Sequence, residues 1–507
     1  MIERRNLEIL IDSHFPIILI ESHEELRALE MLKNIVAAKQ GGLYTWTVTQ
    51  GLKSVVHGAG SSLRYENITL QSHDAPPNNP STEPGAMLTT NKSTLKNCVV
   101  ALLDFHPYLT HPNIVRLTKE IAQEFYMNNN RLVLLSHALE IPAEIRRFCA
   151  RFELSLPDSN KLRELIHDEA KLWRTKNGNE KVKADAHAVE LLAQNLTGLT
   201  ISDATRLIRN AIYDDGAITK SDLAAVMEAK YELVGKGGIL SFEYDTASFS
   251  EVGGFRKLKS WLDKRKKPFL AVDGPAVDVP KGILLVGVQG GGKSLAAKAI
   301  AGVWQVPLLR FDLGALYNKF IGETEKNVRE ALKAADVMAP CVLWIDEIEK
   351  GISTNESDNG TSQRVLGTLL TWMAERGSRV FVVATANNIE QLPPELIRKG
   401  RLDEIFFVDL PSPAIRGEIL RTHLQKRGID ATTLDLVQAA QASDGFSGAE
   451  LEQAVVAARY SALALDETLN TAHLIAEIGQ TRPLSVVMAE RISALREWAQ
   501  SRTVAVD

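Results

Sequence analysis

The chain has 507 residues, and its 58 Lys and Arg against 63 Asp and Glu leave a formal net charge of −5 at pH 7. A charge this close to neutral gives no overall footprint for nucleic acid or an anionic membrane, so we expect neither as a partner. The hydrophobic content of 45% excludes wholesale disorder, and the length suggests about three or four folding units.

Cysteine usage and the early apolar segments bear on the compartment. Three cysteines lie far apart without a CxxC pair, which argues against a disulfide scaffold and favours a reducing environment. The apolar run at 15–20 is far shorter than the ~20 residues that a bilayer span needs. Arg4 and Arg5 could begin an export signal, but Glu8 and Asp12 interrupt its apolar core. We expect the cytoplasm or the plastid stroma.

Two segments mark the organisation of the chain: one interrupts the first half, and the other separates the first half from the second. Residues 71–95 are rich in proline among Ser, Asn and Thr, and they keep no amphipathic period, which predicts an inserted flexible loop. A glycine cluster predicts a linker at 234–247. The first half then comprises an α/β domain over 1–157 and a helical subdomain over 158–233.

The second half alternates strands and helices. Apolar runs at 282–286, 342–345 and 381–384 predict buried strands, and their alternation with helical segments predicts a parallel sheet covered by helices. This large domain spans 248–410. The pattern over 411–507 is almost purely helical, which predicts a smaller lid domain and a C-terminal helix whose apolar face packs on that lid.

A phosphate-binding loop stands between the first of these strands and its helix. Residues 287–294 fit the pattern G-x-x-x-x-G-K-[ST], in which backbone N–H groups and the helix N-terminus surround phosphate oxygens. Lys293 would neutralise the β- and γ-phosphates, and the Ser294 hydroxyl would bind Mg²⁺. The residues predicted to contact nucleotide here are Gly287, Gly290, Gly291, Gly292, Lys293, Ser294 and Leu295.

The next strand ends in two carboxylates, 52 residues after Ser294. That spacing places Asp346 beside the loop, where Mg²⁺ needs an acidic partner. Glu347 is then the candidate general base that polarises the attacking water. An apolar run followed by two acids is weak evidence alone, but the spacing from the phosphate loop makes it specific.

Polar residues after the third strand complete the candidate site. Asn387 could hold the water or the γ-phosphate, with Asn388 as an alternative and a plain turn as a third interpretation. Arg398 and Arg401 are either a solvated basic turn or arginine fingers that reach the ATP of the next subunit. A finger contributes roughly 10³–10⁵ in rate, and it would require an oligomer.

These motifs in this order resemble the AAA subfamily of AAA+ ATPases over about 249–474. Val252 and Gly253 resemble the turn that contacts adenine, and Gly448 and Ala449 resemble the lid turn that closes on the nucleotide. The resemblance implies a P-loop AAA+ α/β fold with a helical lid, ATP and Mg²⁺ as cofactors, and a homohexameric ring that works mechanically on a protein substrate.

Such rings grip their substrate with a pore loop that carries an aromatic residue. Phe320 and Ile321 stand at the matching place, although Phe320 could also be an ordinary core residue. Residues 351–361 resemble a second pore loop or form a plain connection. The phosphate loop lacks the family's two prolines and threonine, which predicts a looser loop and slow turnover. No HExxH motif occurs, which excludes a fused zinc protease of the FtsH type.

The first half reads as a degenerate duplicate of the second. Four segment pairs match in order: 15–21 with 281–287, 98–104 with the strand that ends at Asp346, 141–147 with 392–398, and 197–200 with 444–447. We interpret the first half as a degenerate ATPase-like α/β module with an insertion and its own helical subdomain. Chance similarity between two α/β domains is the alternative. An inactive module before one AAA module resembles a family of AAA proteins from algal plastids and cyanobacteria.

The duplicate should not bind ATP. Residues 21–25 replace the phosphate loop without glycine or lysine, and their three carboxylates should repel a triphosphate. Phe105 takes the place of the catalytic glutamate. Arg147 and Arg151 are finger-like or structural. The histidines show no helical ligand spacing, so we interpret them as structural rather than as a metal site.

Three functions remain open. The first is a ring motor, driven by Mg²⁺-ATP, that remodels or unfolds a protein. The second is an assembly switch with slow hydrolysis, which the loosened phosphate loop favours. The third is a nucleic-acid translocase, which the net charge of −5 disfavours.

Overall fold

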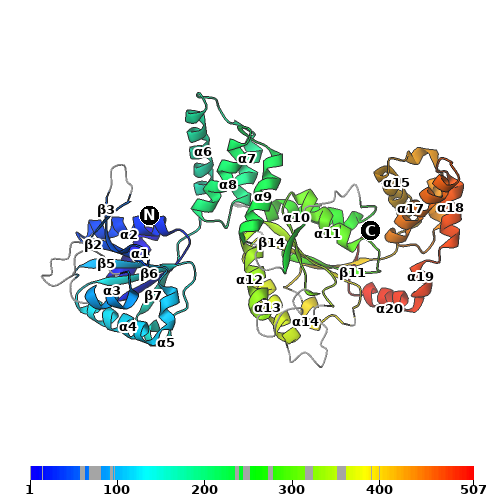
Figure 1. Ribbon diagram of the computed structural model, residues 1–507. Coiled ribbons are helices and arrows are strands. Elements are labelled where there is room, and N and C mark those ends of the chain that lie inside the picture. Colours follow the sequence, from blue (N-terminus) through cyan, green and yellow to red (C-terminus); the bar gives the residue numbers. More distant parts are fainter. Residues whose placement is uncertain are drawn as a thin grey trace. The chain divides into compact units, whose positions relative to one another are not determined.

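The computed structural model contains two compact units, Met1–Leu156 and Pro157–Asp507, which are described separately (Figure 1). Among the described helices, none combines the length and the apolar content that a bilayer span requires. The structure describes residues 2–13, 15–57, 63–67, 82–91, 95, 97–234, 239–243, 252–271, 278–314, 324–350, 361–389, 391–398 and 400–507.

The first unit is a sheet between two helical layers. Its strand order is β4-β3-β2-β5-β6-β1-β7, with β3 and β4 antiparallel at one edge and the remaining strands parallel. Helices α1 and α2 pack on one face, and α3, α4 and α5 pack on the other (Figure 1). The strands are β1 (Ile17–Glu21), β2 (Gly42–Thr47), β3 (Gly51–His57), β4 (Leu63–Asn67), β5 (Cys98–Leu103), β6 (Arg131–Ser136) and β7 (Cys149–Phe152); the helices are α1 (Ile2–Asp12), α2 (Glu25–Ala38), α3 (Pro84–Asn91), α4 (Pro112–Met127) and α5 (Ala143–Arg146).

Helix α3 corrects the prediction that residues 71–95 form a loop throughout. The Glu83 carboxylate accepts a hydrogen bond from Gly85 N at 3.0 Å, and Pro84 starts the helix, where its missing N–H costs nothing. Met87 and Leu88 are buried in the core of the unit. The helix is too short for its amphipathic period to be visible in the sequence. The proline-rich part at 71–81 lies outside the described residues.

The second unit begins with a helical bundle that has its own core. The helices are α6 (Ser159–Lys176), α7 (Ala186–Asn195), α8 (Ile201–Tyr213) and α9 (Lys220–Val234), with two-residue strands β8 (Lys183–Ala184) and β9 (Ala217–Ile218) between them. Strand β10 (Leu240–Glu243) follows and pairs antiparallel with β12 of the next sheet. Residues 240–243 therefore belong to the sheet of the large domain and not to a linker, because their backbone groups join its edge.

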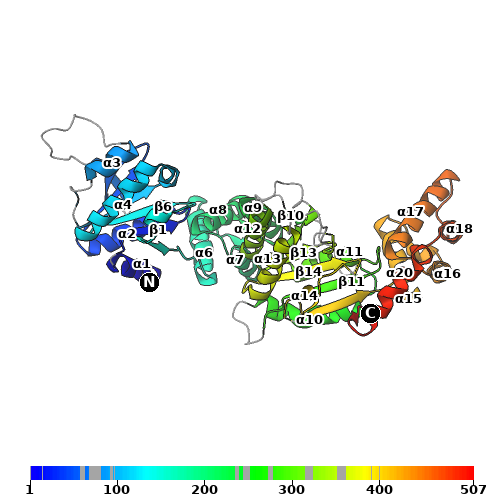
Figure 2. The same ribbon diagram turned by 90° about the horizontal axis from the view of Figure 1, so that it is seen from below.

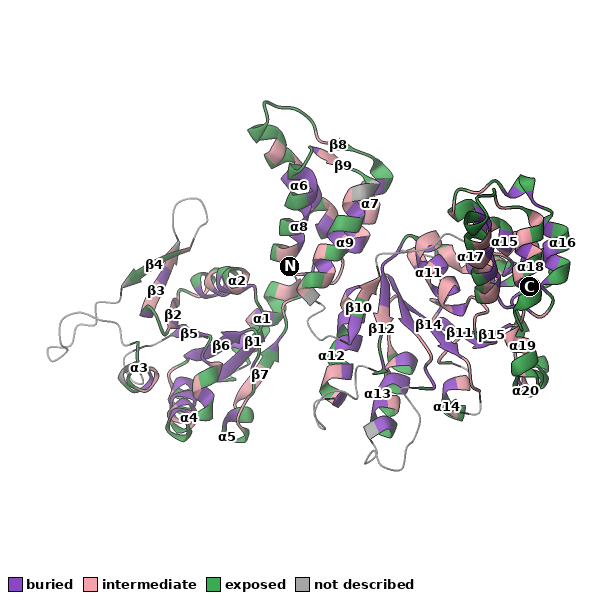
Figure 3. Cartoon of the chain, turned by 45° about the vertical axis from the view of Figure 1, so that its right-hand side comes forward, coloured by how far each residue is buried: buried purple, intermediate pink, exposed green. Residues whose placement is uncertain are grey.

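The central sheet of the second unit has the order β10-β12-β13-β14-β11-β15-β16. Helices α10 and α11 cover one face, and α12 and α13 cover the other (Figure 2). Its middle strands are buried along their whole length (Figure 3). The remaining strands are β11 (Gly282–Gly287), β12 (Leu308–Phe311), β13 (Cys341–Ile345), β14 (Val380–Ala386), β15 (Glu404–Val408) and β16 (Val504–Ala505); the helices are α10 (Arg256–Leu270), α11 (Lys293–Trp304), α12 (Thr324–Val337), α13 (Thr361–Glu375) and α14 (Pro394–Ile397).

The lid is helical, but the chain does not end in it. Its helices are α15 (Pro413–Lys426), α16 (Leu436–Ala442), α17 (Gly448–Ala464) and α18 (Thr471–Gln480), followed by α19 (Leu484–Val487) and α20 (Ala489–Gln500). The predicted packing of the last helix on the lid is wrong, because Leu495 and Ala499 join the core of the large-domain sheet. After α20, strand β16 pairs parallel with β15. This return brings the last residues beside the large domain.

The two units share one topology. The parallel strands run β2-β5-β6-β1-β7 in the first unit and β12-β13-β14-β11-β15 in the second, so the first of these strands in sequence lies fourth in both five-strand orders. The helical parts match as well. Thr200 caps α8 and Ser447 caps α17, and each follows a glycine with positive φ, Gly198 at 82° and Gly445 at 79°. The degenerate ATPase-like fold of the first half is thereby confirmed.

Candidate active site

The loop between β11 and α11 turns sharply at glycines. Gly290 and Gly292 have φ values of 76° and 93°, in the left-handed region that glycine adopts without strain. A Cβ atom on Gly287 would lie 2.0 Å from Val408 O, so no side chain fits where the loop leaves the sheet. The glycines let the loop turn into the N-terminus of α11, where unpaired helical N–H groups favour an anion.

Lys293 lies at the centre of that loop. Its side chain is buried, and Nζ donates hydrogen bonds to Gly287 O and Val288 O, both at 2.8 Å. Burial lowers the pKa of Lys293 to about 8, although nearby carboxylates, led by Glu349, oppose the shift. The ammonium group is therefore still mostly charged at neutral pH, in a position to neutralise phosphate.

Ser294 and Asp346, the predicted metal ligands, are brought together. Ser294 Oγ lies 3.3 Å from Asp346 Oδ1, and Thr385 Oγ1 donates to the same carboxylate oxygen at 2.7 Å. A hydroxyl and a carboxylate are oxygen donors of the kind that Mg²⁺ prefers. Thr385 was not predicted, although its position near the end of β14, the strand that pairs with β13, indicates that it can reach Asp346.

Glu347 is held on both sides. Asn387 Nδ2 donates to Glu347 Oε1 at 2.7 Å, and Lys350 forms an ion pair with Oε2. Glu347 itself has a φ of 46°, a conformation that costs energy for a non-glycine residue and is often found at functional positions. Asn387 is fixed in turn, because the Glu349 carboxylate accepts a hydrogen bond from its backbone N at 2.8 Å. Lys350 and Glu349 were not predicted.

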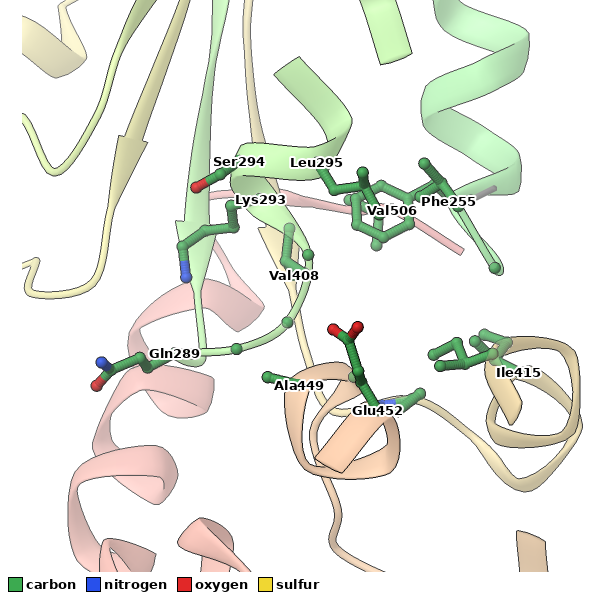
Figure 4. Close-up of a pocket in the computed structure, with 18 of the residues that line it drawn as sticks. Phe255, Gln289, Lys293, Ser294, Leu295, Val408, Ile415, Ala449, Glu452 and Val506 are labelled. Atoms are coloured by element: carbon green, nitrogen blue, oxygen red, sulfur yellow. The ribbon is translucent and has the colours of Figure 1, made fainter. Parts of the chain in front are cut away.

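These groups border a cavity of about 460 Å³ (Figure 4). The phosphate loop forms one side of it, and the lid forms another through Gly448 and Ala449. Ala449 N donates to Gly290 O at 3.2 Å, so the lid turn contacts the loop directly. Every predicted nucleotide-contacting residue lines this cavity except Gly287, which precedes the loop.

The apolar end of the cavity combines the predicted Val252 with residues that the sequence did not reveal. Val252 and Phe255 are buried there, and Val506 joins the same apolar cluster after the turn back along β16 (Figure 4). Val506 N donates to Phe407 O at 3.2 Å, and Lys257 N donates to Val506 O at 2.9 Å. A flat apolar wall of this kind suits a purine base.

The lid adds a charged cluster to the same cavity. Arg427 Nη2 lies 2.8 Å from Glu452 Oε1, and His423 Nδ1 lies 3.5 Å from the same oxygen. Burial lowers the pKa of His423, and the Glu452 charge only partly opposes that shift. His423 and Glu452 both line the cavity, so they could contact the sugar or the base of a nucleotide.

The predicted fingers and pore residues lie elsewhere. Neither Arg398 nor Arg401 lines the cavity. Arg398 is exposed, and Arg401 Nη1 donates to Glu395 O in α14. Phe320 and Ile321, like residues 351–360, lie outside the described residues.

The corresponding edge of the first unit has no such loop. Only residues 22–24 join β1 to α2, whereas residues 288–292 join β11 to α11. The expected repulsion by three carboxylates is weaker than predicted, because Arg151 pairs with Glu21 at 2.9 Å and Arg27 pairs with Glu24 at 2.8 Å. Arg151 is thus a structural partner in this structure. The short connection, rather than charge alone, removes the phosphate cradle.

Comparisons with known proteins agree with this division. Residues 283–410 match the ATPase family associated with various cellular activities (AAA). Residues 3–154 match the N-terminal domain of SpoVK-like AAA ATPases, and residues 160–237 match their second domain. The three matches fall in both units.

One relative matches nearly the whole chain, and two others match only part of it. The AAA domain-containing protein ycf46 of Guillardia theta is 32% identical over 504 residues, which cover 98% of this chain and 95% of the relative. The proteasome-activating nucleotidase of Aeropyrum pernix is 41% identical over 194 residues, 37% of this chain and 47% of the relative. The ATP-dependent zinc metalloprotease FtsH of Parabacteroides distasonis is 33% identical over 258 residues, 48% of this chain and 34% of the relative.

Proposed function

The chain is an AAA ATPase of the family that includes ycf46, and from this premise we propose that it uses ATP hydrolysis, in a homohexameric ring, to remodel or unfold a protein substrate. The observation that carries the chemistry is the convergence of the loop lysine with Asp346, Glu347 and Asn387 around one cavity. The work on protein is supported by the names of two relatives, a proteasome activator and a protease.

Each part of the site has a role in this proposal. Lys293 and the loop N–H groups bind the triphosphate, and Val252, Gly253 and Val506 receive the base. Ser294 and Asp346 would hold Mg²⁺, which supplies charge neutralisation at the phosphates when it is bound.

The hydrolytic step falls to Glu347 and Asn387. Glu347 removes a proton from the attacking water, and Asn387 keeps the carboxylate oriented through the 2.7 Å hydrogen bond. Arg398 and Arg401 act on the site of the neighbouring subunit, since their own cavity does not include them. Phe320 and Ile321 would grip the substrate in the pore.

An assembly switch is the second candidate, and specific contacts favour it. Lys293 is bound to the carbonyl groups of its own loop, and Glu347 is bound to Lys350. Before hydrolysis, Lys293 must leave these carbonyl groups for the phosphates, and Glu347 must be released by Lys350. Both changes would slow turnover. In a switch, ATP binding closes the ring and recruits partners, and hydrolysis resets it.

Replacing the proposed pore aromatic separates the two candidates. For a motor, Phe320→Ala should abolish the ATP-dependent unfolding of a loosely folded protein such as casein, followed by protease sensitivity, while basal hydrolysis remains. The control is Tyr126→Ala, which removes an exposed aromatic side chain of the first unit. If the wild type unfolds nothing and Phe320→Ala leaves ring assembly unchanged, the motor is contradicted and the switch is favoured.

A further inference from the structure

Three metal-ligating side chains meet at the carboxyl edge of the first sheet. Asp104 directly follows β5, His106 begins the short 3₁₀ helix His106–Thr110, and His137 directly follows β6. One ligand atom from each of them lies within 4.8 Å of the other two. Because β5 and β6 are parallel neighbours, their carboxyl ends deliver these side chains to the same place.

Ser136 orders two of these groups. Its hydroxyl lies 2.9 Å from Asp104 Oδ1 and 2.7 Å from His106 Nδ1. The single hydroxyl proton goes to the carboxylate, which can only accept, so His106 donates its Nδ1–H to Ser136. This tautomer leaves the lone pair of His106 Nε2 free, and metal-binding histidines are usually held by such a hydrogen bond on the other ring nitrogen.

A third imidazole lies beside the cluster. The His23 ring stacks on the His137 ring with a centroid separation of 5.6 Å and an interplanar angle of 19°. The His106 ring meets His137 edge-on at 5.0 Å. His23 belongs to the connection between β1 and α2, so three strand ends converge here, as they do at the nucleotide site of the second unit.

The site is accessible to a cation. His137 Nδ1 lies 4.0 Å from Asp104 Oδ1, and both side chains are more than half exposed, at 52% and 62%. Both side chains can therefore rotate, so that their ligand atoms move by the few ångströms needed for tetrahedral coordination of one ion.

We propose that Asp104, His106 and His137 bind a divalent transition-metal ion of the zinc class, with His23 as a candidate fourth ligand. Two imidazoles with one carboxylate suit Zn²⁺ and its neighbours, whereas Mg²⁺ and Ca²⁺ favour oxygen donors. The relation to the second unit supports this position. Ser136 hydrogen-bonds Asp104 as Thr385 hydrogen-bonds Asp346, so the degenerate module keeps an acidic strand end and surrounds it with imidazoles.

Titration of the full chain with Zn²⁺ tests the site. Isothermal calorimetry would be run without nucleotide and with excess Mg²⁺, so that the oxygen ligands of the ATPase site are occupied. Co²⁺ would then replace Zn²⁺, because its visible absorption reports coordination by nitrogen and its geometry. His137→Ala and Asp104→Asn are the test variants. His187→Ala is the control, since it removes an exposed histidine of the helical bundle.

We expect one equivalent of Zn²⁺ to bind stoichiometrically at micromolar protein, with a Co²⁺ spectrum of low symmetry. Each test variant should weaken binding by at least ~10-fold, with circular dichroism unchanged, and His187→Ala should bind as the wild type does. Wild-type protein without saturable binding would overturn the proposal. So would Zn²⁺ binding that both test variants retain. ATP binding at the second unit does not enter either result.

Discussion

The side-chain amide of Asn387 donates a hydrogen bond to Glu347 Oε1 over 2.7 Å. Lys350 pairs with the other oxygen of the same carboxylate. Glu347 is therefore positioned between an amide that can orient it toward a water molecule and an ammonium group that holds it back. In the proposed mechanism, hydrolysis requires Lys350 to release Glu347 while the hydrogen bond from Asn387 is kept.

The first prediction concerns this carboxylate. Glu347→Gln keeps the hydrogen-bonding shape but removes the base, so hydrolysis should fall by about 10²–10⁴ while ATP binding is unchanged. Phosphate release and nucleotide titration measure the two quantities. Glu375→Gln alters an exposed glutamate at the end of α13 and should behave as the wild type. Hydrolysis at the wild-type rate in Glu347→Gln would remove Glu347 from the mechanism.

The second prediction concerns the number of nucleotide sites. Lys293→Ala should abolish ATP binding by the full chain, because the loop loses its buried cation and the first unit has only residues 22–24 where a phosphate cradle would be needed. The wild type should bind one nucleotide per chain. Lys333→Ala, on the exposed side of α12, is the control. Micromolar binding that survives in Lys293→Ala would show that the first unit binds nucleotide.

The third prediction tests action between subunits. Arg401→Ala should retain ATP binding and lose roughly 10³–10⁵ of the hydrolysis rate. Mixing it with the Lys293→Ala chain should restore part of the activity, because a chain that cannot bind ATP still offers its arginine to a neighbour. Arg116→Ala, an exposed arginine of α4, should leave the rate unchanged. Mixed rings without restored activity, or full activity in a monomer, would contradict the finger role.

The fourth prediction concerns the return of the chain to the cavity along β16. Val506 is 5% exposed and lines the cavity, whereas Val504 in the same strand is 37% exposed. Val506→Ser should weaken ATP binding by about tenfold, the effect of losing ~1.4 kcal/mol of apolar contact. Val504→Ser is the matched control. Equal affinities in the two variants would show that this wall does not receive the base.

The sequence could predict the residues that follow strands along the chain, such as Asp346, but not those that reach the site from a distant segment, such as Val506. The phosphate loop, Asp346 and Glu347 could be predicted because each directly follows a buried apolar strand, β11 or β13. Val506 could not, since it reaches Val252 and Phe255 only through the two-residue pairing of β16 with β15. Strand periodicity cannot be recognised over so short a segment.

Side chains that meet across different strand ends were missed for a related reason. His106 and His137 show no ligand spacing in the sequence, yet the parallel register of β5 and β6 brings them together. Only the duplication, which places Asp104 at a strand end like Asp346, could have directed attention to that edge. Helix α3 was not predicted, because Glu83 and Pro84 start it within a segment whose composition indicates a loop.

Lys230 holds the turn by which the helical bundle contacts the ATPase domain within the second unit. It is 1% exposed, and Nζ donates to Asn195 O at 2.8 Å and to Thr197 O at 2.6 Å. Thr197 Oγ1 in turn donates to Ala339 O at 3.0 Å. A Cβ on Gly198 would lie 2.6 Å from Val337 O, so the turn packs tightly against the end of α12. The lysine therefore fixes the turn that docks on the ATPase domain.

The fifth prediction follows from the charge of this lysine. Burial lowers the pKa of Lys230 from the ordinary 10.5 to about 7. Between these values the unfolded chain holds the proton and the folded chain does not, so the free energy of unfolding rises with pH, by up to ~1.4 kcal/mol per pH unit. Lys230→Met removes this dependence and leaves two carbonyl groups without a donor. Its loss of stability relative to the wild type, measured by urea denaturation, should therefore increase by about 2 kcal/mol from pH 7 to pH 9. Lys171→Met, at an exposed position of α6, should follow the wild type. A stability difference that stays constant over this range would mean that Lys230 remains charged in the folded protein.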